Sequence, residues 1–369
     1  MYKIPKPTIK LDDFFDDLLA NRQSEAGNFR MGRIKSIKTE LIEKEIRYSQ
    51  LILDEEKNDL HLITPFQKIN IPRDTLVLNF FNFSAATPKN KLIEKITNYK
   101  LINFIDVDTA STSEIILEQL EGVTLEHLDN YITDEEDLYK HIRYVDKDVM
   151  KEAYEDYIVK GFEGIGRDTY DELMLLADSG ICPYCFLGSV NTLDHYLPKA
   201  KYIDYAITPV NLIPCCNECN KYKSDEIYDS EDKLLINSYF EDVSKLNWLD
   251  GEVVEGFPIT FKFKINSSLV DSSLKRRLER QFVKLKLGSR YSRAAGRVFR
   301  IRVKSIAQDY EHGGLESVKK KLESDKDSAE DLNLNSLEAK VYESLIKSEW
   351  FMRKDTIEEV IVNYKIITK

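Results

Sequence analysis

The chain has 369 residues, a mass of 43.0 kDa and a formal net charge of −11 at pH 7. Hydrophobic residues make up 42% and charged residues 32%, as in an ordinary globular protein, and the length predicts two or three domains. No run of about 18 apolar residues occurs, which excludes a conventional transmembrane helix. The first residues lack the apolar core of a secretory signal, so we expect a cytoplasmic protein with no membrane partner.

Residues 1–150 carry mixed patterns, helix-like over 11–19 and 34–51 and β-rich over 75–83 and 101–107. These patterns predict an N-terminal α+β region. The sequence does not reveal the role of this region.

Residues 148–177 predict two helices broken at Gly161–Gly166. This glycine group lacks the spacing of a phosphate-binding loop, and no Lys followed by Ser or Thr comes after it. No nucleotide-hydrolysis motif occurs elsewhere in the chain. An ATP-dependent function would therefore need a separate ATPase subunit.

All five cysteines lie between Cys182 and Cys219, where Cys182/Cys185 and Cys216/Cys219 form two Cys-x-x-Cys pairs. Four thiolates at this spacing predict one closed tetrahedral zinc site, which is structural because it has no open position. Cys215 could replace Cys216 as a ligand, but only Cys216 keeps the two-residue spacing. The plainer alternative is a set of core cysteines without metal. Such clustering fits a reducing compartment better than a disulfide framework.

Two predicted strands and a helix lie between and after the cysteine pairs. Residues 192–196 and 210–213 read as strands, and a helix is expected from Glu218. This segment also contains four polar residues that a structural zinc does not need: Asp194, His195, Asn211 and Asn220.

The remaining chain predicts a hairpin and then helices. Residues 246–265 alternate with period two, and Asp250-Gly251 offers a turn. From Ser272 onward the periodicity is mostly helical, with interruptions expected at three glycine positions: Gly288, Gly296 and Gly313-Gly314. The predicted domains are therefore an N-terminal α+β region (1–150), a zinc-containing domain (151–232) and a mostly helical C-terminal region (233–369).

Positive charge is concentrated in one window. Lys275–Lys304 contains twelve basic residues and one acidic residue, a net formal charge of +11 in an acidic protein. Steps of four and three would align part of this window along one helix face that contacts a nucleic-acid backbone, formed by Lys286, Arg290, Arg293, Arg297, Arg300 and Lys304. A solvated helix face, or pairing with the acidic parts of the protein, is the alternative.

The order CPYC…LDHYLPK…NLIPCCNECNKYK resembles the HNH endonuclease family, whose core is a ββα-metal fold. His195 stands at the first family position, Asn211 at the middle one and Asn220 at the last, and Lys223 completes the C-N-x-x-K ending. A looser likeness from about residue 148 to the C-terminus links the chain to defence-associated bacterial HNH proteins, which are often encoded beside an ATPase. The resemblance implies a metal-dependent endonuclease that cuts DNA, in an anti-phage system.

Hydrolysis of a phosphodiester gives these residues roles. A neutral imidazole can take a proton from water, so His195 is the predicted general base. Asp194 and Asn220 offer oxygen ligands for a catalytic Mg²⁺ or Mn²⁺. Because neighbours on a strand face opposite sides, we expect a bulge or a strand end at Asp194 and His195. The resemblance implies that Asn211 braces a loop through backbone hydrogen bonds.

Plainer roles stay open for several of these residues. Asp194 could cap a turn, and Asn220 could be the N-terminal cap of a helix. Lys199 and Lys223 are predicted phosphate contacts but could be solvated surface charges. For the whole chain, the alternatives are a non-catalytic zinc module that binds nucleic acid or a partner, and an RNA-cleaving nuclease on the same fold.

Overall fold

Short antiparallel strand pairs and helices of very different length alternate along the chain, which places it in the α+β class as expected. In this computed structural model the described residues are 1–13, 37–53, 57–66, 165–269 and 272–364, with short pieces at 15, 34, 69–70, 144–145, 147, 150–151 and 154–155. The predicted strands at 75–83 and 101–107, and most of the predicted helix at 11–19, lie outside them.

The N-terminal elements are small. Helix α3 (Lys38–Leu51) coincides with most of the helix predicted over 34–51, and it leads into the paired strands β1 (Ile52–Leu53) and β2 (Lys57–Asn58). A second pair joins two segments that are far apart in sequence, β3 (Ile69–Asn70) and β4 (Tyr144–Val145).

Helix α10 (Ile165–Leu175) is the second of the two helices expected over 148–177. The break between the two helices was expected to extend to Gly166, but α10 already begins at Ile165, so Gly166 lies in its first turn. The helix packs against the strand pair that follows, with Thr169 and Leu173 buried.

The cysteine region folds as two strands and a helix: β5 (Thr192–His195), β6 (Leu212–Cys215) and α11 (Asn217–Lys223). The strands pair antiparallel in regular register, from Thr192 opposite Cys215 to His195 opposite Leu212. Strand β6 starts two residues later than expected because residues 209–211 form a 3₁₀ turn that begins with proline. Helix α11 starts one residue earlier than expected.

The hairpin is formed by β7 (Leu249–Val254) and β8 (Thr260–Ile265), but its turn is not the expected one. Asp250 and Gly251 lie inside β7. At Gly251 a Cβ atom would come 2.5 Å from the Ser344 hydroxyl, so this glycine allows a close approach rather than a turn. The chain reverses over residues 255–259, where Gly256 has φ +116°.

Four helices complete the chain: α12 (Ser273–Lys284), α13 (Leu287–Leu332), α14 (Leu337–Lys347) and α15 (Lys354–Asn363). Of the three expected interruptions only Gly313-Gly314 breaks helical geometry, and it divides α13 into two arms. Gly288 and Gly296 lie within the helix. The break between α12 and α13 is instead at Lys286, which is left-handed with φ +53°. None of the helices in the described residues has the length and apolarity to cross a bilayer.

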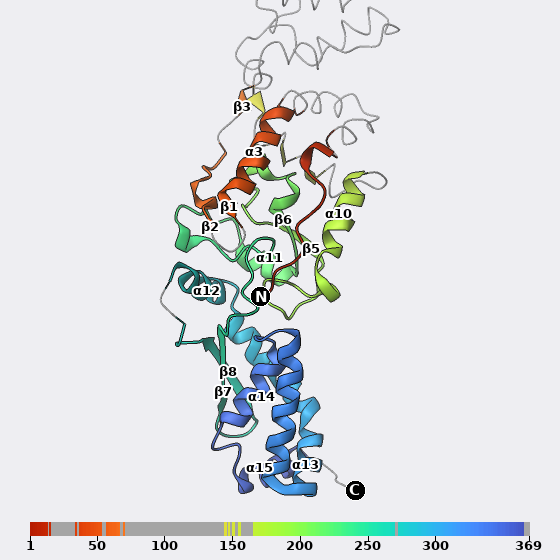
Figure 1. The fold of residues 1–369 in the computed structure, drawn as a ribbon, viewed down its shortest axis with the longest axis vertical. Helices are drawn as coiled ribbons and strands as arrows, with labels where there is room; N and C mark the ends of the chain where they lie inside the picture. The colour runs from red at the N-terminus through yellow and green to blue at the C-terminus, as the bar shows by residue number, and fades with distance from the viewer. Residues whose placement is uncertain are drawn as a thin grey trace, which may run out of the picture.

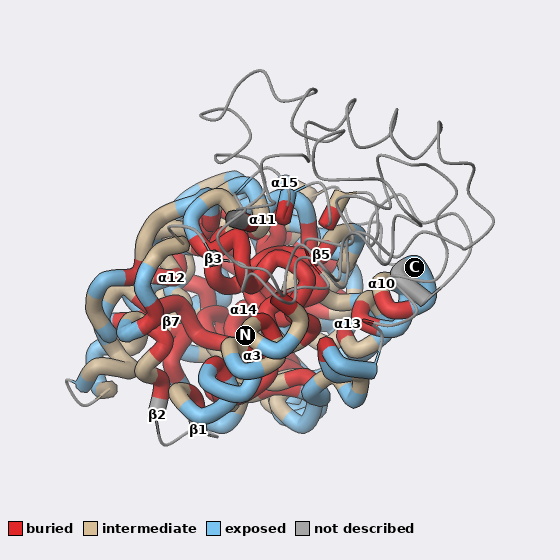
Figure 2. The backbone as a smooth tube through the Cα atoms, turned by 90° about the horizontal axis from the view of Figure 1, so that it is seen from above, coloured by how far each residue is buried: buried red, intermediate tan, exposed pale blue. Residues whose placement is uncertain are grey.

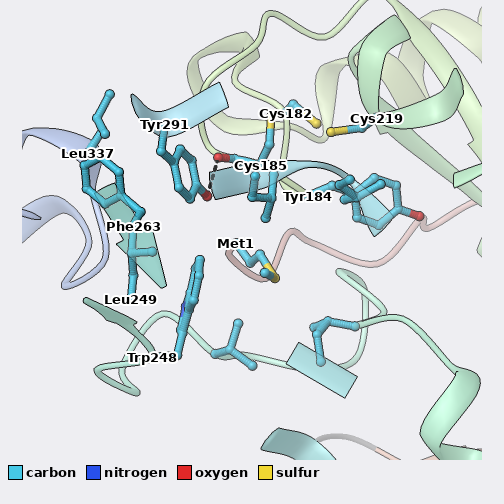
Figure 3. Close-up of a cluster of buried hydrophobic side chains, with 14 of the residues drawn as sticks. Met1, Cys182, Tyr184, Cys185, Cys219, Trp248, Leu249, Phe263, Tyr291 and Leu337 are labelled. Atoms are coloured by element: carbon cyan, nitrogen blue, oxygen red, sulfur yellow. Dashed lines mark hydrogen bonds between the residues drawn. The ribbon is translucent and has the colours of Figure 1, made fainter. Parts of the chain in front are cut away.

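Buried side chains from these elements form one continuous cluster. Figure 1 shows α3, α10 and the β5–β6 pair in one half of the molecule, α13–α15 and the β7–β8 hairpin in the other, and α12 between them. Figure 2, a view at right angles, shows buried segments in the middle and exposed segments around the rim. The core connects the two halves directly, since Figure 3 shows Tyr291 between Cys185 and Phe263, and the rings of Phe263 and Tyr291 are 5.8 Å apart between centroids.

Candidate metal centre and polar site

Four cysteine sulfurs converge on one point. The sulfurs of Cys182, Cys185, Cys216 and Cys219 all lie within 4.8 Å of one another, and all four residues are buried. The first pair lies in a tight turn before β5, closed by a hydrogen bond from the Phe186 N–H to the Cys182 carbonyl at 2.8 Å. The second pair lies at the start of α11. The pairing of β5 with β6 brings the two turns together.

This cluster fits a tetrahedral zinc ion in residue type, number and closeness. Hydrogen bonding from the Cys182 thiol is the main cause that lowers the pKa of Cys185 to about 7, whereas burial raises the pKa of Cys182 well above its ordinary value. Cys215 lies on β6 opposite Thr192, so the cluster contains Cys216, as expected, and not Cys215. The fold thus brings four cysteines into an arrangement that could hold a zinc ion.

Arg290, expected on an exposed basic face, is instead buried against these sulfurs. Its guanidinium lies 3.2 Å from the Cys219 sulfur, 3.4 Å from that of Cys185 and 3.6 Å from that of Cys216. Burial lowers the pKa of this guanidinium, but the charges of Cys219 and Cys185 outweigh burial and the net shift is upward. The helical phase was predicted correctly, but the first turn of α13 packs on the cysteine cluster rather than facing solvent.

His195 is the last residue of β5, so the strand end that we expected is present and the alternative, a bulge, is not. Its Nε2 lies 3.0 Å from the Ala206 carbonyl oxygen, and its ring packs edge-to-face on Tyr154 at 4.4 Å between centroids. Only 7% of the residue is exposed. Burial, and then the charge of Lys199, lower the pKa of His195 to about 3, so the imidazole is neutral at cellular pH.

Asp194 forms a buried ion pair with Lys223. The Lys223 ammonium lies 3.2 and 3.1 Å from the two carboxylate oxygens and also donates to the His195 carbonyl at 2.5 Å. Tyr184 donates to Asp194 at 2.8 Å. Lys223 is 1% exposed, so the alternative of a solvated surface charge is wrong, because the lysine pairs with a buried carboxylate. Its contact with phosphate stays a prediction.

Asn211 makes hydrogen bonds in both directions to backbone. Its side-chain oxygen accepts from the Leu197 N–H at 2.8 Å, and its amide group donates to the carbonyls of Leu197 at 3.2 Å and Tyr205 at 3.1 Å. These bonds tie the start of β6 to the loop that leaves β5. They are the bonds of a residue that braces a loop.

Asn220 lies in the middle of α11, so the alternative of an N-terminal cap is excluded; Cys216 precedes the helix at that position. Its amide group lies 3.4 Å from the hydroxyl of Thr192, which is two residues before Asp194 and hence on the same face of β5. A carboxylate and an amide on one face are a suitable donor set for a hard cation. A cation at Asp194 would have to displace the Lys223 ammonium.

Tyr154 and Tyr184 were not singled out from the sequence. Tyr154 packs on the imidazole of His195. The ammonium of the partly exposed Lys199 lies 4.6 Å from the Tyr154 ring centroid and 3.8 Å from a carboxylate oxygen of Glu155. Tyr184 lies between the two cysteines of the first pair, but its hydroxyl donates a hydrogen bond to Asp194, ten residues later. No spacing rule connects a tyrosine to either partner.

The basic window divides into paired and unpaired charges. In α12, Arg277 forms a buried pair with Glu241 at 2.6 Å, and Arg276, Arg280 and Lys284 pair with Asp232 or Glu226. Lys286 precedes α13 and lies over the Tyr222 ring, and Arg300 lies over the Tyr364 ring. Among the described residues, three exposed cations of the predicted stripe have neither a carboxylate partner nor an aromatic ring beside them: Arg293, Arg297 and Lys304.

Comparisons with known proteins give little beyond this geometry. No protein-family model matches the chain. It is similar to a curated protein named "Protein ea31" of Escherichia phage lambda, with 28% identity over 134 residues that cover 35% of this chain. The match spans 45% of that protein's length, less than half. No solved structure matches.

Proposed function

We propose that this protein is an HNH-type endonuclease that hydrolyses phosphodiester bonds, with a ββα-metal core at residues 192–223 stabilised by zinc. The observation that carries the proposal is the orientation of His195. When its Nε2–H donates to the Ala206 carbonyl, Nδ1 is the nitrogen left to accept a proton. A fixed tautomer of this kind is what a general base requires.

The surrounding residues support the base. Asn211 holds the loop after β5, and Lys223 binds the His195 carbonyl, so both fix the backbone on which the imidazole is mounted. Lys199 lowers the pKa of His195 as a positive neighbour. A bound phosphate that pairs with Lys199 cancels this effect and raises the basicity of Nδ1 when substrate is present.

A divalent cation is part of the proposal. Asp194 and Asn220 would hold Mg²⁺ or Mn²⁺, which would supply charge neutralisation at the phosphate when bound. Lys223 would then leave the Asp194 carboxylate, and its ammonium would become available to the phosphate. The DNA backbone would extend to the unpaired cations of α13, Arg293, Arg297 and Lys304.

The experiment is cleavage of plasmid DNA and of tRNA by the purified protein, with Mg²⁺ or Mn²⁺ added or omitted. Omission is better than chelation, because a chelator also removes zinc. We expect metal-dependent DNA cleavage, and a loss of about 10²–10⁴-fold in rate for His195→Ala. The matched control is His312→Ala, since His312 is exposed and bonds only within its own helix.

The outcomes separate the alternatives. Cleavage of tRNA alone would indicate an RNA-cleaving nuclease on the same fold. Binding of nucleic acid with no cleavage in any metal would indicate a non-catalytic zinc module. If His195→Ala cuts as fast as the parent, the assignment of the base is wrong.

A role in anti-phage defence, with a separate ATPase subunit, is the cellular part of the proposal and rests on the resemblance alone. Expression of the chain with and without its genomic neighbours, followed by phage plaque counts, tests it. Equal plaque counts for parent and His195→Ala would remove this part and leave the nuclease proposal intact.

A further inference from the structure

We infer that Arg290 is an outer-sphere partner of the zinc–thiolate centre and that it couples metal binding to the docking of α13 on the cysteine core. Nothing in the nuclease proposal requires this role. It follows from where the guanidinium lies and from the charge that the cluster carries.

Charge compensation is the first step of the argument. Four thiolates and one zinc ion leave a formal charge of −2 in a buried place. Arg290 is 4% exposed and contacts three of the four sulfurs at 3.2–3.6 Å, while its carboxylate neighbour Glu218 is largely in solvent. Beside four neutral thiols, this buried guanidinium would keep only the carboxylate of Glu218, 3.1 Å away and half exposed, as a counter-charge. The position of Arg290 is therefore stable when the sulfurs are thiolates, as metal binding requires.

Hydrogen bonding to sulfur is the second step. Arg290 presents both terminal nitrogens to the cluster, and the Gly188 N–H points to the Cys185 sulfur at 3.5 Å. Partners of metal ligands fix ligand orientation and tune the metal, and their loss typically costs about 10–100-fold in metal affinity. Gly188 permits the close approach, because a Cβ atom there would come 2.9 Å from the Cys216 sulfur.

The link to α13 is the third step. Arg290 and Tyr291 are consecutive in the first turn of α13, and Tyr291 donates to the Cys185 carbonyl at 2.9 Å, as Figure 3 shows. A cleft of about 370 Å³ separates the cysteine turn from the next turn of α13, and Arg293 and Arg297 line it. The start of the helix is thus fastened to the metal centre, while the exposed cations follow one turn later.

The experiment compares zinc affinity and the spectrum of the cobalt(II)-substituted centre in the parent, Arg290→Met and Arg290→Lys. Affinity is measured by competition with a chromophoric chelator. We expect Arg290→Met to bind zinc about 10–100-fold more weakly. Its sulfur-to-cobalt charge-transfer band should shift to lower energy, because sulfurs without N–H donors give up electrons more easily. Arg290→Lys keeps the positive charge but not the planar set of guanidinium donors, so its zinc affinity and its charge-transfer energy should lie between those of the parent and of Arg290→Met.

Arg293→Met is the matched control, since Arg293 is exposed on the same helix, and it should equal the parent in both measurements. An Arg290→Met protein with the parent's zinc affinity and cobalt spectrum would overturn the inference. If Arg290→Met does not fold, hydrogen exchange in the parent decides. Removal of zinc should expose the hydrogen-bonded amides of residues 290–294 in α13 before those of α14, and unchanged protection of these amides would also overturn the inference.

Discussion

The cysteine-bearing core (residues 182–223) and the basic window (Lys275–Lys304) are both rich in functional residue types. They differ in how well residue type and spacing predict where the side chains lie in the fold. In the core, the residues selected by type and spacing meet at two neighbouring places, the sulfur cluster and the polar site. In the basic window, six of twelve cations pair with groups of the protein itself, five with carboxylates and Arg290 chiefly with sulfur. Net charge alone therefore overstates the surface available to a polyanion.

The difference has a physical cause. Short loops between metal ligands leave few conformations in which four sulfurs can meet, so the spacing nearly determines the geometry. The partner of a surface arginine is set by tertiary packing, and Arg277 finds Glu241 thirty-six residues earlier in the chain. No local pattern contains that information.

Removal of zinc should have the largest effect, because the metal would hold together the cysteine-bearing core. Metal binding at such a site can contribute on the order of 10 kcal/mol to folding, so Cys216→Ser should lose both zinc and cooperative unfolding. Metal analysis and thermal melts by circular dichroism measure this. Cys215→Ser is the control, because Cys215 is equally buried but outside the cluster. A Cys216→Ser protein with full zinc content would contradict the assignment.

Breaking a buried ion pair should cost about 3–5 kcal/mol in either region, because one charge is left without its partner. Lys223→Met leaves Asp194, and Arg277→Met leaves Glu241. Chemical denaturation measures both. The double variant Lys223→Met/Asp194→Asn should recover part of the loss. An exposed ion pair typically contributes about 0–1 kcal/mol. If Lys223→Met and Arg277→Met lower the free energy of unfolding by no more than that, these pairs are not buried in solution.

Much of the fold and site could be predicted from the sequence, and the failures share one origin. The two strands, the helix after them and the cysteine ligands follow from periodicity and spacing. The turn at Asp250-Gly251 was wrong because Gly251 serves the approach of Ser344, ninety-three residues away. Arg290 and Lys223 were predicted to contact nucleic acid, and their burial was not foreseen, because a sequence shows their charge but not the buried anion beside each one.

Glu45 lies in α3, outside both the core and the basic window, and its buried carboxyl should make stability depend on pH. Burial raises its pKa to about 7, and the Leu11 N–H bonds only one of its oxygens. The folded state thus holds the proton more tightly than the unfolded chain. This contribution, about 3 kcal/mol, is complete below pH 4.5 and is lost as the pH rises through 7. The difference in unfolding free energy between the parent and Glu45→Gln, measured from pH 4.5 to 8, should follow this curve. A difference that is constant with pH would refute it.

The smallest effect on stability should come from the unpaired cations of α13, and it sharpens the comparison most. Arg293→Gln, Arg297→Gln and Lys304→Gln remove no side-chain hydrogen bond or ion pair in the described residues, so each should change the free energy of unfolding by no more than about 0.5 kcal/mol. If these residues contact a nucleic-acid backbone, each substitution should lower the slope of log affinity against log salt by about one. Lys320→Gln is the control, because Lys320 is exposed on the second arm of α13, beyond the glycine break. An unchanged slope in all three variants would mean that the basic window serves the protein's own packing, and that a nucleic acid binds elsewhere.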